Sequence, residues 1–359
     1  MTARGSIKVL IVDDSAMVRR VLTLGLSADP GIEVVGAVSN AEAAWALMQH
    51  ERPDVVTLDI EMPGMDGLTF LKTYLAKIPI PTVMISSLTR EGAQITLRAM
   101  EAGAVDVIAK PTVGLADGLP GIMSGVCARV RAAAGARVMV GSRSAVRTSA
   151  QAAPVAVPRG APSGTVIALG ASTGGVQALS RILPLFPEDS PGIVIVQHMP
   201  EGFTGAFAQR LDALCRMSVR EAQDGEPVTT GSILIAPGGT RHMSLQRRGT
   251  GFAVALSEGE PVCYSRPSVD VLFESVARVA GGRAVAAVMT GMGRDGANGL
   301  LAIRRAGGRT LVQDEATSVV FGMPMAARDI GAAEEVLPLD ALPARLLAFL
   351  TQMQARVRA

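Results

Sequence analysis

Residues 165–175 read TVIALGASTGG, and the larger part of the chain is organised around this stretch. Residues 166–169 are a short apolar run, typical of a strand buried on both faces, and the glycines that follow end the strand and permit a helix. Ser172 lies at this break in the pattern G-x-S-x-G, which in hydrolases exposes a serine hydroxyl on a tight strand-to-helix turn. A plain turn or a phosphate-binding loop has the same pattern. The stretch therefore makes Ser172 a candidate nucleophile and leaves both alternatives open.

The segment beyond residue 163 continues the alternation of strands and helices. Apolar runs expected to be strands cover residues 193–197, 232–236, 284–289 and 309–312, and residues 252–256 are expected to form an antiparallel addition. Helical segments separate most of these runs, so we predict a doubly wound, Rossmann-like α/β domain over residues 163–359. Its ligands should meet at the carboxyl ends of the strands.

Two more reactive side chains follow predicted strands of this domain. His198 follows residues 193–197 directly, and Asp295 lies in the glycine-rich turn after the run that begins at residue 284. A serine, a histidine and a carboxylate at the ends of different strands can assemble a hydrolytic triad in which the carboxylate orients the base. Because the chain order Ser, His, Asp differs from that of α/β-hydrolases, we exclude that fold.

The first part of the chain shows the same alternation. Expected strands cover residues 7–12, 33–38, 55–58, 82–85 and 105–109, and helical segments such as 41–49, 67–75 and 90–102 separate them. Five strands alternating with helices within about 120 residues predict a parallel sheet covered on both faces. We therefore predict a separate doubly wound domain over residues 1–127, with its site at the carboxyl strand ends.

Charged and polar side chains end the strands of this first domain. Asp13 and Asp14 follow the first strand, and Asp59, Ser86 and Lys110 follow or end the third, fourth and fifth. Three carboxylates at one edge repel one another unless a hard cation such as Mg²⁺ lies among them, and a lysine with a hydroxyl suits a phosphoryl group. The pattern predicts a magnesium-dependent phosphoryl site.

Residues 1–127 resemble a response-regulator receiver domain, which is flavodoxin-like. The motifs that carry the resemblance are VLIVDDS at 9–15, LDIEMPGMDG at 58–67 and the pair Lys110–Pro111. The resemblance implies that Asp59 accepts a phosphoryl group from a histidine kinase and that Asp13, Asp14 and Asp59 hold Mg²⁺. It also implies that Ser86 and Lys110 follow the phosphoryl group as the switch.

Alternatives remain for the second domain. The rivals are His242 for the base, and Asp270 and Asp314 for the carboxylate. Residues 291–296 also fit G-x-G-x-x-G after a strand, with Asp314 about 20 residues further on, as in a dinucleotide-binding fingerprint. The alternative function is therefore a receiver-controlled dinucleotide-binding module or oxidoreductase. Against it, Asp295 would lie where the pyrophosphate charge approaches.

Composition restricts the remaining function classes. A net charge of +2 and 3% aromatic residues do not favour nucleic-acid binding, and we find no basic recognition helix for a DNA-binding output domain. No apolar run approaches the roughly 20 residues of a membrane span, and the N-terminus lacks the pattern of a signal peptide. We therefore expect a cytoplasmic protein without direct membrane insertion.

Residues 128–162 are expected to be a linker. The segment is rich in Ala, Arg, Ser, Gly, Val and Pro, and its apolar residues are too few and too irregular to form a core. Its arginines are expected to be solvated, with binding of an acidic partner as the alternative.

Receiver, linker and C-terminal domain in this order resemble the CheB family of chemotaxis protein-glutamate methylesterases. The motifs are GASTGG at 170–175, VQHMP at 196–200, PGG at 237–239, RHM at 241–243, SRPSVD at 265–270, TGMGRDG at 290–296 and FGMP at 321–324. The resemblance implies that Ser172 is the nucleophile, His198 the general base and Asp295 its orienter, with the amide of Met292 as an oxyanion donor.

The same resemblance implies substrates and partners. Family members hydrolyse glutamate methyl esters on chemoreceptor cytoplasmic helices, and many also deamidate glutamines. The expected partners are a chemotaxis histidine kinase as phosphodonor and methyl-accepting chemoreceptors as substrate. Mg²⁺ is expected at the receiver domain, and no cofactor is expected for ester hydrolysis.

Overall fold

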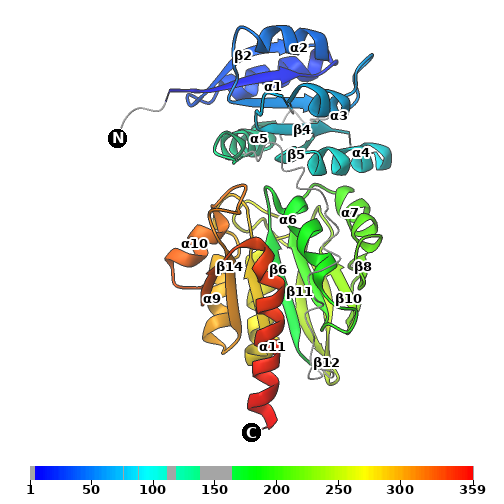
Figure 1. The fold of residues 1–359 in the computed structure, drawn as a ribbon, viewed down its shortest axis with the longest axis vertical. Helices are drawn as coiled ribbons and strands as arrows, with labels where there is room; N and C mark the ends of the chain where they lie inside the picture. The colour runs from blue at the N-terminus through cyan, green and yellow to red at the C-terminus, as the bar shows by residue number, and fades with distance from the viewer. Residues whose placement is uncertain (1–4, 76, 88, 111–118, 138–163, 359) are drawn as a thin grey trace. The chain divides into compact units, whose positions relative to one another are not determined.

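The computed structural model describes residues 5–75, 77–87, 89–110, 119–137 and 164–358. The chain divides into two compact units, residues 1–145 and 146–359. In each unit, strands alternate with helices around a parallel sheet, as Figure 1 shows. This arrangement confirms the predicted pair of doubly wound α/β domains.

The N-terminal unit contains a five-stranded sheet in the order β2-β1-β3-β4-β5, with all neighbouring strands parallel. The strands are β1 (Ile7–Val12), β2 (Ile32–Val38), β3 (Val55–Asp59), β4 (Thr82–Ser86) and β5 (Asp106–Ala109). The helices are α1 (Ala16–Ser27), α2 (Ala41–Met48), α3 (Gly67–Phe70) with a π-helical turn (Leu71–Leu75), α4 (Arg90–Glu101) and α5 (Leu119–Ala134). This strand order is that of flavodoxin-like folds, as predicted.

Short polar side chains begin the helices that follow these strands. Ser15 accepts a hydrogen bond from the N–H of Val18 at the start of α1, and Asn40 does the same for α2 from Ala43. Such caps satisfy N–H groups that the first turn of a helix leaves free. The capped helices α1 and α2 therefore begin within a few residues of the ends of β1 and β2.

Helix α5 continues beyond residue 127, where the sequence placed the end of the receiver domain. Its later residues still pack inward, because Val130 and Ala133 are completely buried and Arg129 forms an ion pair with Asp106 of β5. The segment from 128 to Ala134 is therefore helical rather than part of an extended linker. The rest of the predicted linker, residues 138–162, lies outside the described residues.

The C-terminal unit is built on a seven-stranded parallel sheet. Its order is β15-β14-β13-β6-β7-β10-β8. These strands are β6 (Val166–Ala171), β7 (Ile193–Gln197), β8 (Ser218–Glu221), β10 (Ser232–Ile235), β13 (Ala284–Val288), β14 (Arg309–Gln313) and β15 (Glu335–Leu337). The chain builds the sheet outward from β6 in one direction and later returns to its other side with β13, so β6 borders the topological switch point where ligands bind in such sheets.

Helices and a small second sheet complete this unit. The helices are α6 (Gly175–Ile182), α7 (Phe203–Asp212), α8 (Val269–Ala280), α9 (Ala297–Arg305), α10 (Met323–Asp329) and α11 (Leu342–Arg358), with single 3₁₀ turns at Leu183–Leu185, Gly281–Arg283 and Leu339–Ala341. The antiparallel strands are β11 (Arg241–Arg248), β12 (Gly251–Glu258) and β9 (Pro227–Val228). The predicted antiparallel addition at residues 252–256 is confirmed as the centre of β12.

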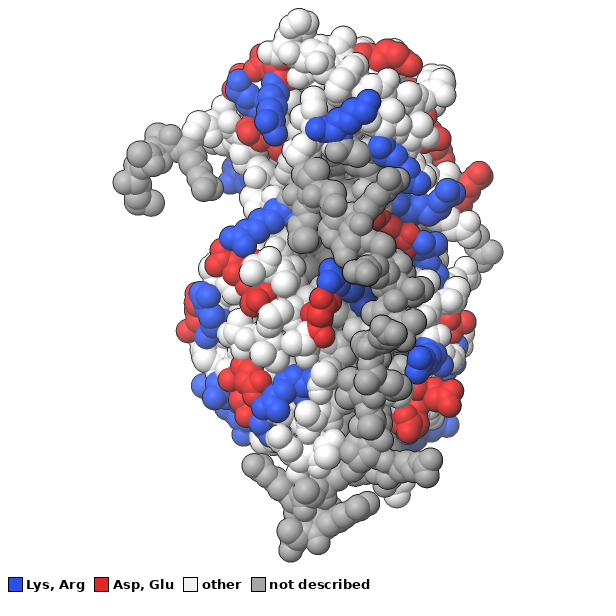
Figure 2. Space-filling model, viewed as in Figure 1, with Lys and Arg blue, Asp and Glu red and all other residues white. Residues whose placement is uncertain are grey.

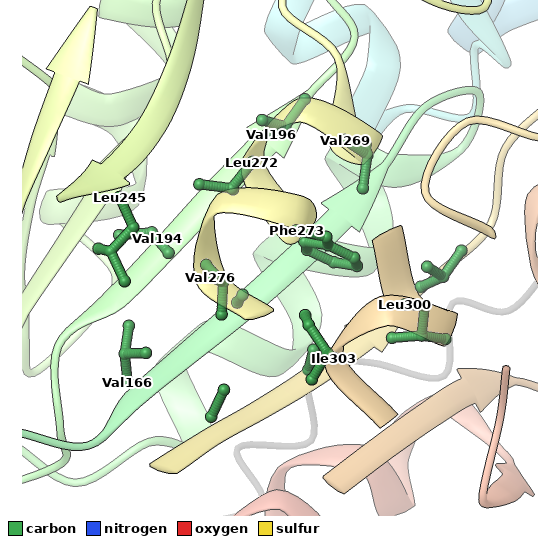
Figure 3. Close-up of a cluster of buried hydrophobic side chains, with 14 of the residues drawn as sticks. Val166, Val194, Val196, Leu245, Val269, Leu272, Phe273, Val276, Leu300 and Ile303 are labelled. Carbon is green, nitrogen blue, oxygen red and sulfur yellow. The ribbon is translucent and has the colours of Figure 1, made fainter. Parts of the chain in front are cut away.

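Helix α8 fixes the core on the side of the sheet that carries the second sheet. Figure 3 shows Leu272, Phe273 and Val276 of α8 between the strand residues Val166 and Val196 and residues of α9, and all these side chains are wholly buried. Burial of such side chains stabilises the fold by about 1.5–3 kcal/mol each. The start of α8 is therefore held firmly beside the carboxyl ends of β6 and β7.

The distribution of surface charge and the composition of the helices both bear on function. On the face drawn in Figure 2, the Lys and Arg side chains of the described residues are interspersed with Asp and Glu. Within the described ranges, no helix has both the length and the apolar composition needed to cross a membrane.

Candidate functional site

The carboxyl ends of three neighbouring strands bring together the predicted triad. β6 lies between β13 and β7, and Ala171 pairs with Gln197, so Ser172 and His198 follow adjacent strand ends. Asp295 follows β13 on the other side of β6. All three residues are buried, with exposed fractions of 9%, 9% and 2%. The geometry therefore joins residues that are distant in the sequence at the switch point of the sheet.

Asp295 holds His198 in a defined orientation. His198 Nε2 lies 2.8 Å from Asp295 Oδ2. The carboxylate also accepts hydrogen bonds from the Ser268 hydroxyl and from the N–H groups of Val269 and Asp270, at 2.7, 2.8 and 2.9 Å. These N–H groups belong to the start of α8, where free donors favour an anion.

The charge of Asp295 decides which nitrogen of His198 carries the proton. Burial alone would raise the pKa of the Asp295 carboxyl, but the His198 hydrogen bond and charge, together with the donors at α8, hold this pKa below its ordinary value. An ionised carboxylate accepts from Nε2–H, so the proton of the neutral ring lies on Nε2. Nδ1 is therefore the nitrogen available as a base.

Nδ1 of His198 faces a serine, but the serine is not Ser172. Ser265 Oγ lies 3.3 Å from Nδ1, whereas the Ser172 hydroxyl has no hydrogen-bond partner within the part of the chain that the structure describes. The backbone fixes Ser172, since its N–H donates to Thr290 O at 3.0 Å and its carbonyl accepts from Gln197 Nε2 at 2.9 Å. Ser172 is thus anchored at the strand end with an unengaged hydroxyl.

The rival base, His242, has both ring nitrogens engaged by the backbone. Nδ1 accepts the N–H of Ser268 at 3.1 Å, and Nε2 lies 2.9 Å from the carbonyl oxygen of Glu260. These two contacts require a neutral ring protonated on Nε2 and leave no nitrogen for a substrate. His242 is therefore suited to a structural role.

The rival carboxylates are used elsewhere. Asp270 Oδ1 accepts the N–H of Gly299 at 2.7 Å, and burial raises the pKa of Asp270 to about 6. Asp314 Oδ1 accepts the N–H and the hydroxyl of Thr317 at 2.9 and 2.6 Å. Of the three candidate aspartates, Asp295 is the one hydrogen-bonded to a histidine.

The turn after β13 brings the backbone of Gly291 close to Ser172. A Cβ at Gly291 would lie 2.3 Å from Met323 Sδ and 2.8 Å from Ser172 Cβ, so only glycine permits this close approach. The next residue is Met292, whose N–H has no acceptor among the described residues. Its role as an oxyanion donor stays a prediction.

The N-terminal unit holds the predicted phosphoryl site. Lys110 Nζ lies 2.7 Å from Asp59 Oδ2 and 3.7 Å from Asp13 Oδ2. Burial raises the pKa of Asp59 to about 6, more than Lys110 lowers it, and burial likewise raises the pKa of Asp13. The positive charge of Lys110 is therefore not enough to offset the burial of the two carboxylates at this edge of the sheet.

The donor set of this edge fits a hard cation. Carboxylate oxygens of Asp13, Asp14 and Asp59 lie within 4.8 Å of one another. Asp13 Oδ2 is buried and accepts no hydrogen bond from any described residue. Oxygen ligands in this arrangement suit Mg²⁺.

The predicted switch residue Ser86 is hydrogen-bonded away from Asp59. Its hydroxyl accepts from Thr96 Oγ1 of α4 at 2.9 Å and donates to the carbonyl of Ser87 at 3.2 Å, while its own carbonyl accepts the N–H of Lys110 at 2.8 Å. A move of Ser86 toward Asp59 would therefore break a buried contact with α4. Its switching role stays a prediction.

Comparisons with known proteins place the chain in a family. The family model described as "CheB methylesterase" matches residues 167–346, and that of the response regulator receiver domain matches residues 9–115. A Cereibacter sphaeroides protein named "Protein-glutamate methylesterase/protein-glutamine glutaminase of group 2 operon" is 63% identical over 343 residues, which are 96% of this chain and 92% of that protein. The chain belongs to the CheB methylesterase family.

A second relative and a solved structure of the CheB family are also similar to this chain. A Bordetella parapertussis protein named "Protein-glutamate methylesterase/protein-glutamine glutaminase" is 49% identical over 352 residues, 98% of this chain and 99% of that protein. The crystal structure of the Thermotoga maritima CheB methylesterase catalytic domain matches with a TM-score of 0.51 and 38% identity, and covers 52% of this chain and 99% of that chain. The resemblance inferred from the motifs is confirmed.

Residues 291–296, which fit the dinucleotide-binding pattern, serve a different purpose in this CheB methylesterase domain. The space beside Gly291 is filled by Met323 and Ser172, and the Asp295 carboxylate lies against His198 and α8. A pyrophosphate at this turn would meet packed side chains and a buried negative charge. The dinucleotide-binding alternative is therefore not favoured.

Two serines of the site received no role from the sequence. Both lie in the SRPSVD motif, where Ser268 donates to Asp295 and Ser265 faces His198. A serine directly before an apolar helical run is a capping signal, and Ser268 does cap α8. That signal could have found Ser268, whereas no local pattern marks Ser265.

Proposed function

We propose that the chain hydrolyses glutamate methyl esters on methyl-accepting chemoreceptors and deamidates glutamines at the same site. The observation that carries the proposal is the buried hydrogen bond between His198 and Asp295 beside the strand end that bears Ser172. The relatives' names supply the chemistry of the substrate. Substrate segments of this kind would be cytoplasmic, which agrees with the location expected from the sequence.

The chemistry follows from the protonation of His198. Ser172 Oγ attacks the ester carbonyl while its proton passes to His198 Nδ1, and Asp295 stabilises the resulting imidazolium through Nε2–H. The Met292 N–H donates to the oxyanion. Collapse of the intermediate expels the alkoxide, which takes the proton from Nδ1 and leaves as methanol.

The second half repeats these steps with water. Nδ1 takes a proton from a water molecule that attacks the acyl-enzyme, and this proton then returns to Ser172 Oγ as the glutamic acid side chain leaves and loses its remaining proton to solvent. A glutamine side chain would react in the same way, with ammonia as the leaving group. The ester step thus uses protein groups alone.

A methanol-release assay tests this function. The full chain is mixed with membranes that contain methylated chemoreceptors, and the methanol formed is measured over time. We expect release that stops when the methyl esters are consumed. A dinucleotide-binding module would release none, so absence of methanol with and without a phosphodonor would contradict the proposal.

We further propose that phosphoryl transfer to Asp59 from a chemotaxis histidine kinase relieves a restraint on the methylesterase domain. The proposal is supported by Lys110, which lies within hydrogen-bond distance of Asp59, and by Ser86, held near the end of the adjacent strand. Mg²⁺, held by Asp13, Asp14 and Asp59, would neutralise charge on the phosphoryl group. The new charge would attract Lys110 and Ser86 and change the face formed by β4 and β5.

Replacement of Asp59 by alanine is expected to abolish the response to a small-molecule phosphodonor. In the unchanged chain, phosphodonor and Mg²⁺ should raise methanol release by about 5- to 150-fold, the usual range of coupling between sites. Asp59→Ala should keep the basal rate, because the ester step does not use Asp59. The matched control is Asp54→Ala. Asp54 lies directly before the same strand, and this variant should respond normally to the phosphodonor. A full response in Asp59→Ala would place the acceptor elsewhere.

Mg²⁺ is expected to stabilise the receiver domain more at neutral than at acidic pH. Burial raises the pKa of Asp59 from 3.8 to about 6, so the folded state holds this proton more tightly than the unfolded chain. The free energy of unfolding therefore falls as pH rises between these values, and the full cost is present above pH 6. Bound Mg²⁺ offsets that cost, by about 2.7 kcal/mol at a concentration of 100 Kd.

Thermal unfolding with Mg²⁺ or with a chelator checks this expectation. The shift in the receiver's unfolding midpoint should shrink as the pH is lowered through the range in which Asp59 titrates. Asp13→Ala should lose most of the shift, and Asp54→Ala should keep it. An equal shift in Asp13→Ala would show that Mg²⁺ binds at another place.

A further inference from the structure

The turn formed by residues 262–265 has an unusual backbone. The N–H of Val262 donates to Ser265 O at 3.1 Å, and the N–H of Ser265 donates to Val262 O at 2.9 Å. The two residues between them, Cys263 and Tyr264, have φ values of 50° and 62°. Two-residue turns with this conformation normally contain Asn and Gly, because other side chains crowd the backbone there. Among the described residues, these are the non-glycine residues with positive φ, so the strain is concentrated at this turn.

Contacts on the carboxyl side of this turn fix it beside the proposed base. Arg266 follows the turn directly, and its Nε and Nη1 donate to the carbonyls of Gly239 and Gly259 at 3.1 and 2.7 Å. Ser265, the last residue of the turn, has its Oγ 3.3 Å from His198 Nδ1. Strained backbone that persists at a functional site is held there by its surroundings. The turn is therefore kept in its strained conformation next to the site.

Fold stability does not account for Tyr264. Its side chain is completely exposed to solvent, so the ring contributes no buried apolar area to the fold. Asparagine or glycine would tolerate the same φ with less strain. An exposed tyrosine ring offers a large apolar area and loses little conformational freedom when another protein covers it, which is why binding surfaces are rich in tyrosine. Tyr264 thus costs stability at a place where it is available to a second molecule.

A second exposed apolar side chain borders the site from the side of the nucleophile. Met292 is exposed, and it follows Gly291, at which a Cβ would lie 2.8 Å from Ser172 Cβ. Ser172 and His198 are themselves buried. A side chain that reacts with them must enter from the rim of the site, and the polypeptide that carries it remains outside, beside Met292 and Tyr264.

We propose that Tyr264 is a substrate-binding residue whose ring packs against the polypeptide on either side of the esterified glutamate. The inference rests on the proposed function, in which the reacting group is a side chain of another protein. A second copy of this chain bound permanently at the turn would close the site to that protein, so the substrate is the occupant. Because the ring lies outside the buried site, it contributes to binding of the substrate protein and not to the chemical steps.

The test is full-length Tyr264→Asn, which should change stability and substrate binding in opposite directions. With phosphodonor and Mg²⁺ present, we expect KM for methylated receptor membranes to rise by about 5- to 30-fold, as for loss of one aromatic contact, with kcat unchanged. The unfolding midpoint of the C-terminal domain should rise by about 2–4 °C, because asparagine relieves the strain of the turn. Tyr264→Phe keeps the ring and should retain the KM and the midpoint of the unchanged chain.

A small reagent separates contact with the substrate from damage to the site. In labelling by a fluorophosphonate, Ser172 Oγ displaces fluoride from phosphorus, and no polypeptide lies on the rim. Tyr264→Asn should therefore be labelled at the rate of the unchanged chain. The matched control is Leu214→Asn, because Leu214 is also an exposed apolar residue but lies between the end of α7 and the start of β8, at the opposite edge of the sheet. This variant should keep both KM and kcat.

Three results would overturn the proposal. These are an unchanged KM in Tyr264→Asn, a slower labelling of Ser172 that matches the loss of methanol release, and a change of oligomeric state, which would assign the ring to a second copy of the chain. Failure of the proposed function gives a different result. In that case the unchanged chain itself releases no methanol although Ser172 is labelled, and the role of Tyr264 falls with it.

Discussion

Replacement of Ser172 by alanine is expected to reduce methanol release by about 10⁴-fold or more. In the proposed mechanism the serine oxygen forms the covalent bond to the acyl group, and losses of this size are usual for a triad nucleophile. The folded state should be almost unaffected, because the hydroxyl makes no hydrogen bond to a described residue and the backbone of Ser172 is held by Thr290 and Gln197. Initial rates and thermal unfolding of the full chain measure both effects.

Ser265→Ala is the informative comparison for this experiment. Ser265 is the serine whose hydroxyl lies next to His198 Nδ1, and it is therefore the alternative nucleophile. We expect its removal to cost only a small part of the rate that removal of Ser172 costs. If Ser265→Ala is inactive and Ser172→Ala retains most of its activity, the two assignments must be exchanged.

Asp295→Asn is expected to lower kcat by a comparable factor, about 10³- to 10⁴-fold, for a different reason. An asparagine can turn its NH₂ group toward His198 Nε2, and this nitrogen would then have to accept a hydrogen bond. The proton of the neutral ring would move to Nδ1, so the base nitrogen would be blocked. The start of α8 would also lose an anionic acceptor, which should reduce the free energy of unfolding by about 1–3 kcal/mol.

Asp270→Asn is the matched control for Asp295→Asn. Both aspartates are buried, and they are neighbours, but the Asp270 side chain bonds to the N–H of Gly299 and not to His198. Because burial raises the pKa of Asp270 to about 6, its charge costs free energy at neutral pH, and a neutral amide should be tolerated. We expect near-normal kcat for Asp270→Asn. Equal losses in the two variants would mean that both act through the stability of α8.

The elements predicted most accurately from the sequence are the buried ones, because buried strands are continuous apolar runs. β7 was predicted with its observed bounds, because a strand in the middle of a parallel sheet is a continuous apolar run. The strands β8, β9, β11 and β15 were missed, since they are partly exposed and mixed in composition. Helix α5 was not predicted, and the end of the receiver domain was placed at residue 127 because the segment that follows resembles a linker in composition. Its burial depends on contacts with the sheet that composition does not reveal.

The sequence by itself determined the fold class and the strand ends that carry Ser172, His198 and Asp295. This was possible because parallel strands place their carboxyl ends at one edge, so a local pattern of strand followed by reactive residue already fixes the site. Only the tertiary structure decided which nitrogen of His198 is bound to Asp295, that both ring nitrogens of His242 are engaged by the backbone, and that Ser265 faces Nδ1. Each of these depends on hydrogen bonds across the fold, such as those from His198 to Asp295 and Ser265, which are 97 and 67 residues away. Contacts over such separations arise from packing and leave no signal in a window of neighbouring residues.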